Sequence, residues 1–432
     1  MHELRIRGQA VLERMRELPG ARELVDLAAG RDDVEIVGGA VRDLLLGRAP
    51  RELDVVVAAD ASSFARDLAS SLGIPLAGDP GGSSGIAVHE RFGTALVWWQ
   101  GGRVDIARRR AESYSAPGAL PDVRAGTPEQ DLLRRDFTVN AIAVVLGGLR
   151  MGSLSAVPHA LEDLAGSRLR VLHERSFVDD PTRLLRLARY LARLEFEPEQ
   201  HTAELAAQAV AGDELSSVSG ARIGAELRLL LEEPDPLAAL GRLSELGILQ
   251  ALHPGLRFEL ALARGALAAL PGDGRPELLL LAALLLGISR DRTADAEQSL
   301  LALLDHLEFT AGDRDRVLTS ALAAPLLPGR LEAARTPSEL AEAVRGAPVE
   351  AVALASSLAE VEGRPAAAAA AARWLSDLRQ VRLLITGDDL LAAGIPPGPE
   401  IGRRLGLALR RKLDGELDGD RAAEMGAAME DP

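Results

Sequence analysis

The sequence of 432 residues contains no cysteine, a single lysine (Lys412) and only 3% aromatic residues. The absence of cysteine excludes disulfide bridges, thiolate metal sites and a cysteine nucleophile, and it fits the reducing cytoplasm. No run reaches the roughly 18 apolar residues of a membrane span, and charges interrupt the N-terminal stretch where a signal peptide has its apolar core. We therefore expect a soluble cytoplasmic protein with no membrane partner.

Charge and hydrophobicity restrict the class of protein further. Hydrophobic residues make up 47% of the chain and charged residues 26%, which excludes a disordered chain and predicts several domains. The net charge of −15, most of it after residue 200, argues against indiscriminate binding to nucleic acid. However, nearly all the basic side chains are arginines, which suit bidentate phosphate contacts, so a local arginine stripe can still follow an RNA backbone.

The pattern of apolar residues changes along the chain. An amphipathic helix is expected at residues 9–29, and strand-like runs follow at 34–39, 52–58, 92–100, 103–110 and 137–146. Gly101 and Gly102 predict a hairpin turn between the third and fourth of these runs. From about residue 180 the apolar spacing becomes helical. We expect a mixed α/β domain followed by an all-helical remainder.

Two acidic residues begin one of the predicted strands. Glu52 and Asp54 are two positions apart, so their side chains point to the same face, whereas Leu53 and Val55 point into the core. Paired carboxylates of this kind hold Mg²⁺ in phosphate chemistry. Asp105 lies in another predicted strand and is a candidate third ligand. The alternative is a solvated strand end with surface acids.

Glycine and arginine form further candidates for phosphate contacts. Gly38 and Gly39 stand between a predicted strand and a helix, where backbone amides can approach an anion, and Arg42 lies one turn further on. Arg134 and Arg135 precede another apolar run. A tight turn and a charged strand entry are the plain alternatives.

A third charged segment, VDDPTRLLRLARY, includes Asp179, Asp180 and Arg183. We expect all three on the first turn of a helix, with Pro181 near its start. Asp180 and Arg183 share a helix face at this spacing, and a carboxylate beside a guanidinium can hydrogen-bond the Watson–Crick edge of a base. Helix capping alone accounts for one acid of this set.

Taken in order, these motifs resemble the class II tRNA nucleotidyltransferase and bacterial poly(A) polymerase family. The resemblance rests on VGGAVRDLLLG, ELDVVV, VDIA, DLLRRDFTVNAIA, VDDPTRLLRLARY and ITGDDLLAAGIPPGPEIGRRLGLAL, and it covers residues 35–250 and 383–410. It implies a polymerase-β-like head with a mixed sheet and two Mg²⁺ ions, followed by all-helical neck, body and tail. The expected boundaries are 1–150 for the head, 151–250 for the neck, 251–375 for the body and 376–432 for the tail.

The resemblance also assigns roles position by position. It makes Glu52, Asp54 and Asp105 the catalytic acids, with Glu52 and Asp54 as the metal ligands. The loop from Arg108 to Gln130 matches the segment that family members move when they switch nucleotide. The implied nucleotide-binding residues are Gly38, Gly39, Arg42, Arg134, Arg135, Asp136, Asn140, Asp179, Asp180, Arg183, Arg186 and Arg189. The expected tRNA-binding residues of the tail are Arg403, Arg404, Arg410, Arg411 and Lys412.

The implied activity is template-independent addition of C, C and A to the 3′ end of tRNA from CTP and ATP, with release of pyrophosphate. The expected partner is the acceptor and T-arm of tRNA, and no protein partner is predicted. Three features depart from the family pattern: Glu52 and Asp179 stand where aspartate and glutamate are usual, and AVPHA (156–160) replaces a segment with a glycine pair. The alternatives are therefore a CC-adding or A-adding member, a poly(A) polymerase, or a non-catalytic RNA-binding paralogue.

Overall fold

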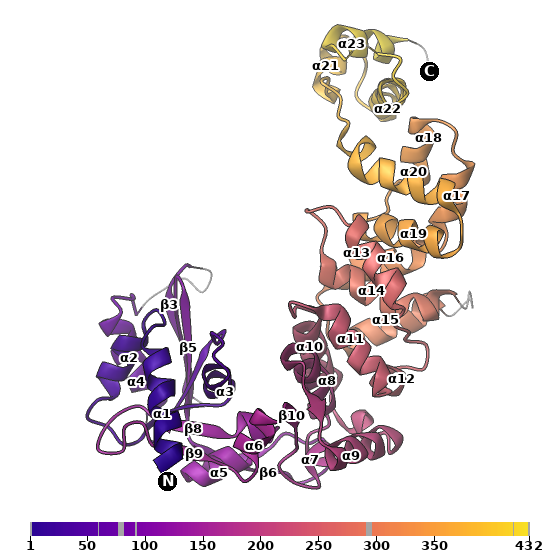
Figure 1. Cartoon of the computed structure of the whole chain (residues 1–432). Helices are drawn as coiled ribbons and strands as arrows, with labels where there is room; N and C mark the ends of the chain where they lie inside the picture. Colours follow the sequence, from indigo (N-terminus) through magenta and orange to yellow (C-terminus); the bar gives the residue numbers. More distant parts are fainter. Residues whose placement is uncertain are drawn as a thin grey trace. The chain divides into compact units, whose positions relative to one another are not determined.

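The structure is a computed structural model that describes residues 2–58, 60–76, 82–90, 93–290, 296–417 and 419–430. It divides into two compact units, Met1–Ser219 and Gly220–Pro432 (Figure 1). The first contains the mixed sheet and the second is helical, which confirms the expected fold class. Among the described residues, every helix is too short or too polar to cross a membrane. The finer division into head, neck, body and tail stays a prediction.

The sheet of the first unit has seven strands in the order β3-β4-β5-β2-β1-β8-β9. Only the pair β2 and β5 is parallel; the other neighbours run antiparallel. The sheet continues beyond residue 150, because β9 pairs with β8. The bounds of its strands are β1 Val34–Val37, β2 Leu53–Val57, β3 Gly85–His89, β4 Thr94–Trp99, β5 Gly102–Arg108, β8 Ile142–Val145 and β9 Leu154–Ala156.

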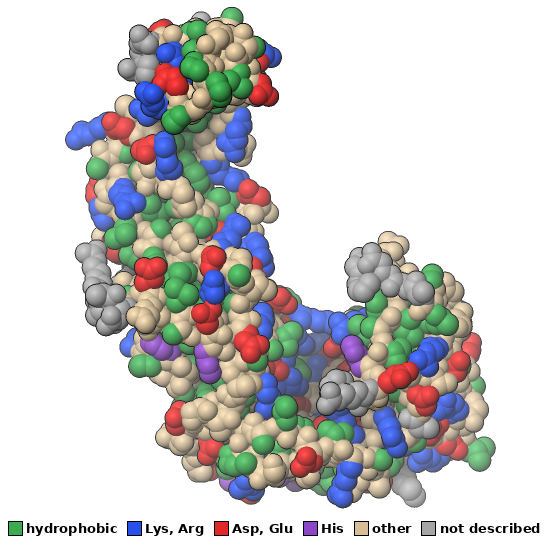
Figure 2. All heavy atoms as spheres, turned by 180° about the vertical axis from the view of Figure 1, so that it is seen from behind, with side chains coloured by type: hydrophobic (Ala, Val, Ile, Leu, Met, Phe, Trp, Pro, Cys, Tyr) green, Lys and Arg blue, Asp and Glu red, His purple; other side chains and the backbone are tan. Residues whose placement is uncertain are grey.

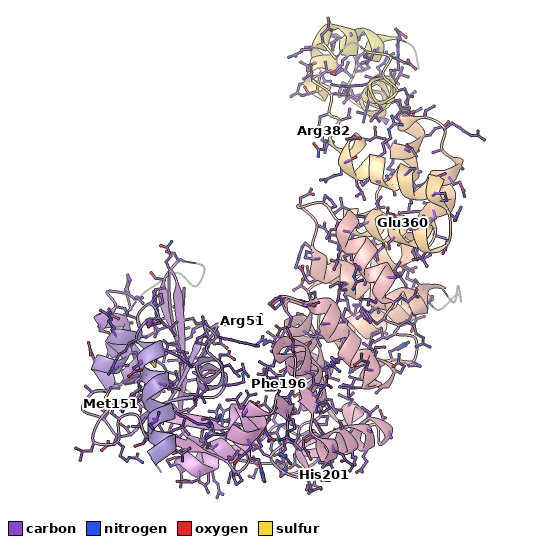
Figure 3. All side chains as sticks on the ribbon, viewed as in Figure 1. Arg51, Met151, Phe196, His201, Glu360 and Arg382 are labelled. Carbon is purple, nitrogen blue, oxygen red and sulfur yellow. The ribbon has the colours of Figure 1, made fainter. Side chains whose placement is uncertain are left out.

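Four helices accompany this sheet: α1 (His2–Met15), α2 (Ala21–Ala28), α3 (Gly39–Leu45) and α4 (Ala61–Ser71). The helix α4 packs on β3, β4 and β5, and α1 packs on α3 and β9. Near Met151, labelled in Figure 3, the Gln9 side chain donates to the Met151 carbonyl at 3.4 Å. These contacts bury the apolar faces of the helices on the strands.

Two local expectations were wrong. The single helix at 9–29 is two helices, because Gly20 adopts φ 71° before α2, a left-handed conformation that interrupts a helix. The strand expected from residue 137 begins only at Ile142, because Thr138–Asn140 forms a 3₁₀ turn. That turn buries Asn140 beside Arg42 and Asp136, two of the residues implied to bind nucleotide.

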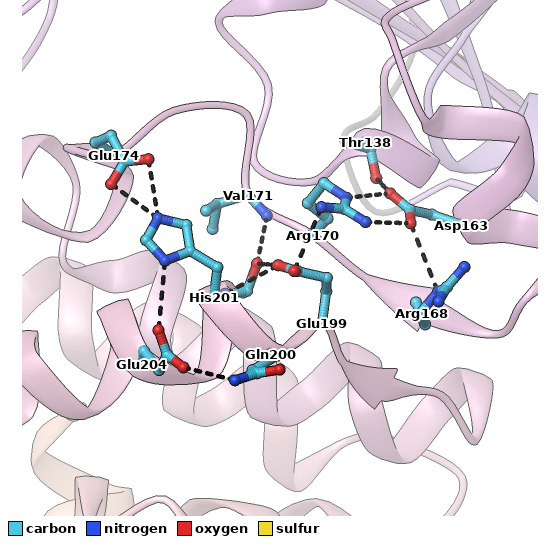
Figure 4. Close-up of polar contacts among 11 residues, drawn as sticks. Thr138, Asp163, Arg168, Arg170, Val171, Glu174, Glu199, Gln200, His201 and Glu204 are labelled. Carbon is cyan, nitrogen blue, oxygen red and sulfur yellow. Dashed lines mark hydrogen bonds and ion pairs between the residues drawn. The ribbon is translucent and has the colours of Figure 1, made fainter.

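After the sheet, the first unit continues with short helices and two-residue strands. These are α6 (Ala160–Ala165), β10 (Arg168–Leu169), α7 (Ser176–Asp179), α8 (Thr182–Leu194), β11 (Glu197–Pro198), α9 (Gln200–Ala211) and η3 (Glu214–Ser217). Figure 4 shows polar contacts around α6, β10 and the start of α9. The buried Asp163 carboxylate accepts from Thr138 Oγ1 at 2.8 Å and from Arg170 Nε at 2.9 Å, so it links α6 and the residue after β10 to the 3₁₀ turn.

The second unit is helical throughout its described part. Its long apolar helix α14 (Pro276–Arg290) packs against α16, and α13 packs against α19. At the C-terminal end of the second unit, a separate small core includes Leu390, Ala408 and Ala428. The remaining helices are α10 Gly220–Leu231, α11 Pro236–Glu245, α12 Ile248–Leu252, α13 Leu260–Ala269, α15 Ala296–His306, α16 Ala311–Ala323, α17 Leu327–Ala333, α18 Pro337–Ala343, α19 Val349–Val361, α20 Pro365–Ser376, α21 Gly387–Ala392, α22 Pro399–Leu413 and α23 Arg421–Met429.

Candidate active site

Three carboxylates gather at the start of the parallel strand pair. The register of β2 and β5 places Asp54 directly opposite Asp105, and Glu52 precedes β2 on the same face. One oxygen from each of Glu52, Asp54 and Asp105 lies within 4.8 Å of the others, and all three residues are half-buried. Leu53 and Val55 are buried on the opposite face, as the alternation predicted.

This cluster is electrostatically costly without a cation. Burial, reinforced by the adjacent Glu52 carboxylate, raises the pKa of Asp54 to about 6. Burial and Glu52 likewise raise the pKa of Asp105 to about 6, against the lowering effect of Arg103. Carboxylate oxygens are the ligands that Mg²⁺ prefers, and a cation between them would relieve this repulsion. The donor set therefore fits the expected magnesium.

The glycine turn before α3 lies against this cluster. Gly38 adopts φ 71°, and a Cβ built on it would lie 2.7 Å from Arg135 Nη1 and 3.5 Å from Asp54 Oδ2. The turn thus leaves room for the Arg135 guanidinium above the backbone. Arg42, in α3, is 1% exposed and donates to Asn140 Oδ1 at 2.5 Å and to Asp43 Oδ1 at 2.8 Å.

A carboxylate that the sequence pattern did not single out binds both Arg134 and Arg135. Asp131, in α5 (Pro128–Leu133), is 1% exposed and accepts from Arg134 Nε and Arg135 Nη2, each at 3.0 Å. Burial opposes its ionisation, but Arg135 and Arg134 outweigh that effect and lower the Asp131 pKa. The only advance signal was an acid three and four residues before two arginines on a helix.

A second buried carboxylate, Asp136, joins the motif arginines to α8. It accepts from Arg186 Nη2 at 2.6 Å and from Asn140 Nδ2 at 3.0 Å. Burial alone would raise its pKa, but Arg186 and Asn140 lower it strongly. Because Asn140 in turn binds Arg42, Asp136 fixes arginines from α3 and α8 in one network.

Tyr190 lies at the centre of these arginines. The guanidinium carbons of Arg42, Arg186 and Arg189 lie 5.3, 5.5 and 5.0 Å from its ring centroid. Arg193 lies 5.8 Å from the same centroid. Four cations around one aromatic ring are held partly by its negative face. The arrangement concentrates positive charge beside the carboxylate cluster, as a polyanionic ligand such as a triphosphate requires.

The predicted base-reading residues do not share one helical turn. Asp179 ends α7, Asp180 follows it, and α8 begins only at Thr182. Asp180 Oδ1 accepts from the N–H of Thr182, the first residue of α8, at 3.2 Å, whereas the buried Arg183 donates to Ser176 Oγ at 2.7 Å and to the Arg134 carbonyl at 2.9 Å. The expectation of a common first turn was therefore wrong. The role of these residues in base selection stays a prediction.

The segment Arg108–Gln130 contains a hairpin of β6 (Arg110–Ser113) and β7 (Asp122–Ala125). Its Glu112 side chain accepts from Arg134 Nη1 at 3.1 Å, and its turn residue Gly118 donates to the Val178 carbonyl at 3.2 Å. Gly118 has φ 66°, and a Cβ there would lie 2.6 Å from the Ser217 carbonyl oxygen. The hairpin thus contacts both a motif arginine and the residue before Asp179.

The basic residues predicted for RNA contact in the tail lie on α22, and several are already paired. Arg404 is 9% exposed and donates to the Ala428 carbonyl, and Arg403 pairs with Glu400. Arg411 pairs with Glu430 at 2.8 Å, and Lys412 pairs with Glu424 at 2.5 Å. On the face of the second unit drawn in Figure 2, basic and acidic side chains are interspersed. RNA contact by these residues and by the exposed Arg410 stays a prediction.

Two protein families match parts of the chain. Residues 34–170 match the family described as Poly A polymerase head domain. Residues 195–260 match the family described as probable RNA and SrmB-binding site of polymerase A. The first match includes the carboxylate cluster and the glycine turn, and the second begins just after α8.

Several curated proteins are similar to the chain. The A-adding tRNA nucleotidyltransferase of Geobacter sulfurreducens is 40% identical over 55% of this chain and 26% of its own length. The A-adding enzyme of Halalkalibacterium halodurans is also 40% identical, over 55% of this chain and 54% of its own length. The chain thus spans about half or less of these two relatives. The CC-adding tRNA nucleotidyltransferase of Deinococcus radiodurans is 34% identical over 87% of this chain and 84% of its own length.

Solved structures resemble the fold over almost the whole chain. A CCA-adding enzyme in complex with ATP has a TM-score of 0.74 and 27% identity, covering 98% of both chains. The Thermotoga maritima CCA-adding enzyme in complex with tRNA has a TM-score of 0.72 and 26% identity, covering 97% of both chains. The similarity therefore extends through the helical unit as well as the sheet.

Proposed function

Because this chain belongs to the tRNA nucleotidyltransferase and poly(A) polymerase family, we propose that it adds CMP and AMP to the 3′ end of tRNA. The nucleotides come from CTP and ATP without a nucleic-acid template, and pyrophosphate leaves. The observation that carries the proposal is the carboxylate cluster of Glu52, Asp54 and Asp105 beside a buried arginine network. The solved relatives with tRNA, ATP and CTP support the choice of substrates.

In the proposed reaction, the 3′-hydroxyl of tRNA loses its proton to solvent, its oxygen bonds to the α-phosphorus of the nucleotide, and the bond from that phosphorus to pyrophosphate breaks. Two Mg²⁺ ions, held by Glu52, Asp54 and Asp105, would polarise the attacking hydroxyl and neutralise the leaving pyrophosphate. The remaining catalysis comes from positioning and charge, because phosphoryl transfer leaves little covalent work to side chains.

The chain's own residues supply that positioning. The glycine turn at Gly38 and Gly39 lets backbone approach the phosphates, and Arg42, Arg135 and Arg186 place positive charge around the same space. Asp131 and Asp136 fix these guanidinium groups before a nucleotide arrives, so little ordering entropy is lost on binding. Arg134 and the buried Arg189 add to the same positive charge.

Selection of the base is assigned to Asp180 and Arg183. The Arg183 guanidinium is oriented by Ser176 and by the Arg134 carbonyl, so its direction is coupled to the phosphate-binding motif. The hairpin that carries Glu112 and Gly118 contacts the same region, and it is therefore suited to change the shape of the base pocket between CTP and ATP. Asp179 forms an ion pair with Arg175 at 3.2 Å, which restrains the chain just before Asp180.

Recognition of tRNA is proposed to depend on shape and phosphate position, since an A-form acceptor stem offers few readable base edges. The candidate contacts are the basic residues of α22. The absence of cysteine fits a cytoplasmic location for this reaction.

A CC-adding specificity is the second candidate. The Deinococcus CC-adding enzyme is similar to this chain over 84% of its own length, a larger share than either A-adding relative. The deciding experiment offers tRNA transcripts that end before CCA, after C and after CC to the purified protein, with CTP and ATP supplied separately and together. Complete CCA addition supports the first proposal, extension that stops after CC supports the second, and no extension of any transcript contradicts both.

A further inference from the structure

Arg103 is a charged neighbour of the three carboxylates. It lies on β5 two residues before Asp105, so the two side chains share a face of the sheet. The register pairs Leu53 with Val104, which places Arg103 across from Glu52 just as Asp105 lies across from Asp54. Three carboxylates and one guanidinium therefore lie at the corners of a small square at the start of two parallel strands.

The Arg103 guanidinium binds the two outer carboxylates of this square. Its Nε lies 3.3 Å from Glu52 Oε2, and its Nη2 lies 3.0 Å from Asp105 Oδ2. These are oxygens of the residues that the proposed function assigns to the metal. A guanidinium that pairs with both carboxylates at this distance competes with a divalent cation for them, because the two positive charges repel each other at close range.

Arg103 differs in this respect from Arg135, another arginine beside the cluster. Arg135 is anchored by the buried Asp131, which is not one of the metal-site acids. Among the described residues, the Arg103 guanidinium pairs with Glu52 and Asp105, and its side chain is 49% exposed. The guanidinium can therefore swing into solvent on its flexible stem without breaking any buried contact.

We propose that Arg103 is a metal-displaced guanidinium. In the metal-free protein it neutralises Glu52 and Asp105, and when a divalent cation binds these carboxylates it is released to the rim of the site. There it presents an unoccupied guanidinium to phosphate oxygens of the incoming substrate. Metal binding and phosphate binding are thus linked through Arg103, because the phosphate supplies a new negative partner for the guanidinium that the metal has displaced. The inference rests on the proposed function only in requiring that a divalent cation bind at this cluster.

The direct test measures the chemical reactivity of Arg103 with an arginine-selective dicarbonyl reagent in the full-length protein, followed by peptide mass spectrometry. Mn²⁺ serves as the cation, without nucleotide or RNA. We expect Mn²⁺ to increase the modification rate of Arg103 several-fold. Arg108 is the internal control, because it lies on the same strand, exposed on the other face, and its rate should not change.

A second measurement uses the Mn²⁺ dissociation constant from electron paramagnetic resonance. Arg103→Gln removes the competing guanidinium, so it should bind Mn²⁺ about fivefold more tightly than the wild type, as expected for losing a partly exposed ion pair. Arg108→Gln removes the same formal charge from the other face and should bind like the wild type. Asp54→Ala should abolish binding, which locates the ion at this cluster. Circular dichroism verifies that each variant is folded.

The outcomes separate the inference from the proposed function. If Mn²⁺ binds but leaves Arg103 reactivity unchanged or lowers it, or if Arg103→Gln binds Mn²⁺ no better than Arg108→Gln, the displacement is refuted while the metal site stands. If neither the wild type nor Arg103→Gln binds Mn²⁺, the metal site itself is wrong and both proposals fall.

Discussion

Replacing Asp131 by asparagine tests whether the buried carboxylate organises the phosphate-binding arginines. Asp131 accepts from Arg134 and Arg135 at 3.0 Å and from the Arg110 backbone N–H at 3.3 Å. Hydrogen bonds to charged groups contribute about 1.5–3 kcal/mol each. The amide keeps one acceptor oxygen but turns an NH₂ group toward a guanidinium, so at least one of these contacts is lost.

The loss of stability is limited by the contacts that the two arginines keep. Arg134 keeps its contact with Glu112 at 3.1 Å, and both arginines are 15% exposed, so water partly replaces the lost acceptor. We therefore expect Asp131→Asn to lower the free energy of unfolding by about 2–3 kcal/mol, below the 3–5 kcal/mol typical of a fully buried broken pair. If about 1.4–2 kcal/mol of this is lost from transition-state binding of the triphosphate, kcat/KM for CTP and ATP falls about tenfold to thirtyfold.

The assay combines urea unfolding with steady-state incorporation of CMP and AMP into tRNA transcripts. Glu129→Gln is the matched control, because Glu129 is exposed on the same helix and should change neither quantity appreciably. A stable Asp131→Asn protein with kcat/KM within twofold of the wild type would refute the view that this carboxylate positions the two arginines.

Three further predictions concern the same site. Gly38→Ala and Gly47→Ala both place a Cβ at positive φ and should each cost about 1–3 kcal/mol of stability. Only Gly38→Ala should lose nucleotide binding, because its Cβ meets Arg135 whereas Gly47 has open space. Equal binding of CTP by both variants, measured by calorimetry, would contradict the role of the turn. The pKa of Asp54 is raised by burial and Glu52 to about 6, so the folded state binds this proton more tightly than the unfolded state, and the metal-free protein should gain stability as pH falls from 7.5 toward 5. Asp105, whose pKa is raised likewise, contributes a gain of the same sign. Asp54→Asn should therefore reduce this gain in melting temperature without abolishing it, and an unchanged pH profile would argue against the raised pKa of Asp54. Tyr190→Phe should keep the KM for CTP, because the aromatic face remains. Tyr190→Leu should raise this KM several-fold with a smaller change in kcat, since Arg42, Arg186 and Arg189 lose the aromatic ring that they share. Equal KM values for the two variants would exclude the cation–π explanation.

The sequence was sufficient for the features that depend on short-range alternation. Glu52 and Asp54 could be placed on one face because side chains alternate along a strand, and Asp105 could be named as a candidate because it has the same alternation. Its position directly opposite Asp54 could not be predicted, because the parallel pairing of β2 and β5 is a long-range choice. The partner of each strand is not encoded by local periodicity.

Buried polar partners were also beyond the reach of the sequence. Asp131 looked like an ordinary helix acid until the fold buried it under Arg134 and Arg135. Arg404 could be named from the sequence as a basic residue of the tail, but not that α23 packs over it and that its guanidinium donates to the Ala428 carbonyl. In both cases the deciding fact is which element packs over the side chain, and that is fixed by tertiary packing.

The most direct test of the account is a crystal of the protein grown with Mn²⁺ and a non-hydrolysable CTP analogue, measured at a wavelength where manganese scatters anomalously. The account predicts anomalous peaks within coordination distance of oxygens of Glu52 and Asp54, with the triphosphate beside Gly38 and Arg135. Anomalous density elsewhere in the molecule, with nucleotide bound and these carboxylates turned away from it, would contradict it.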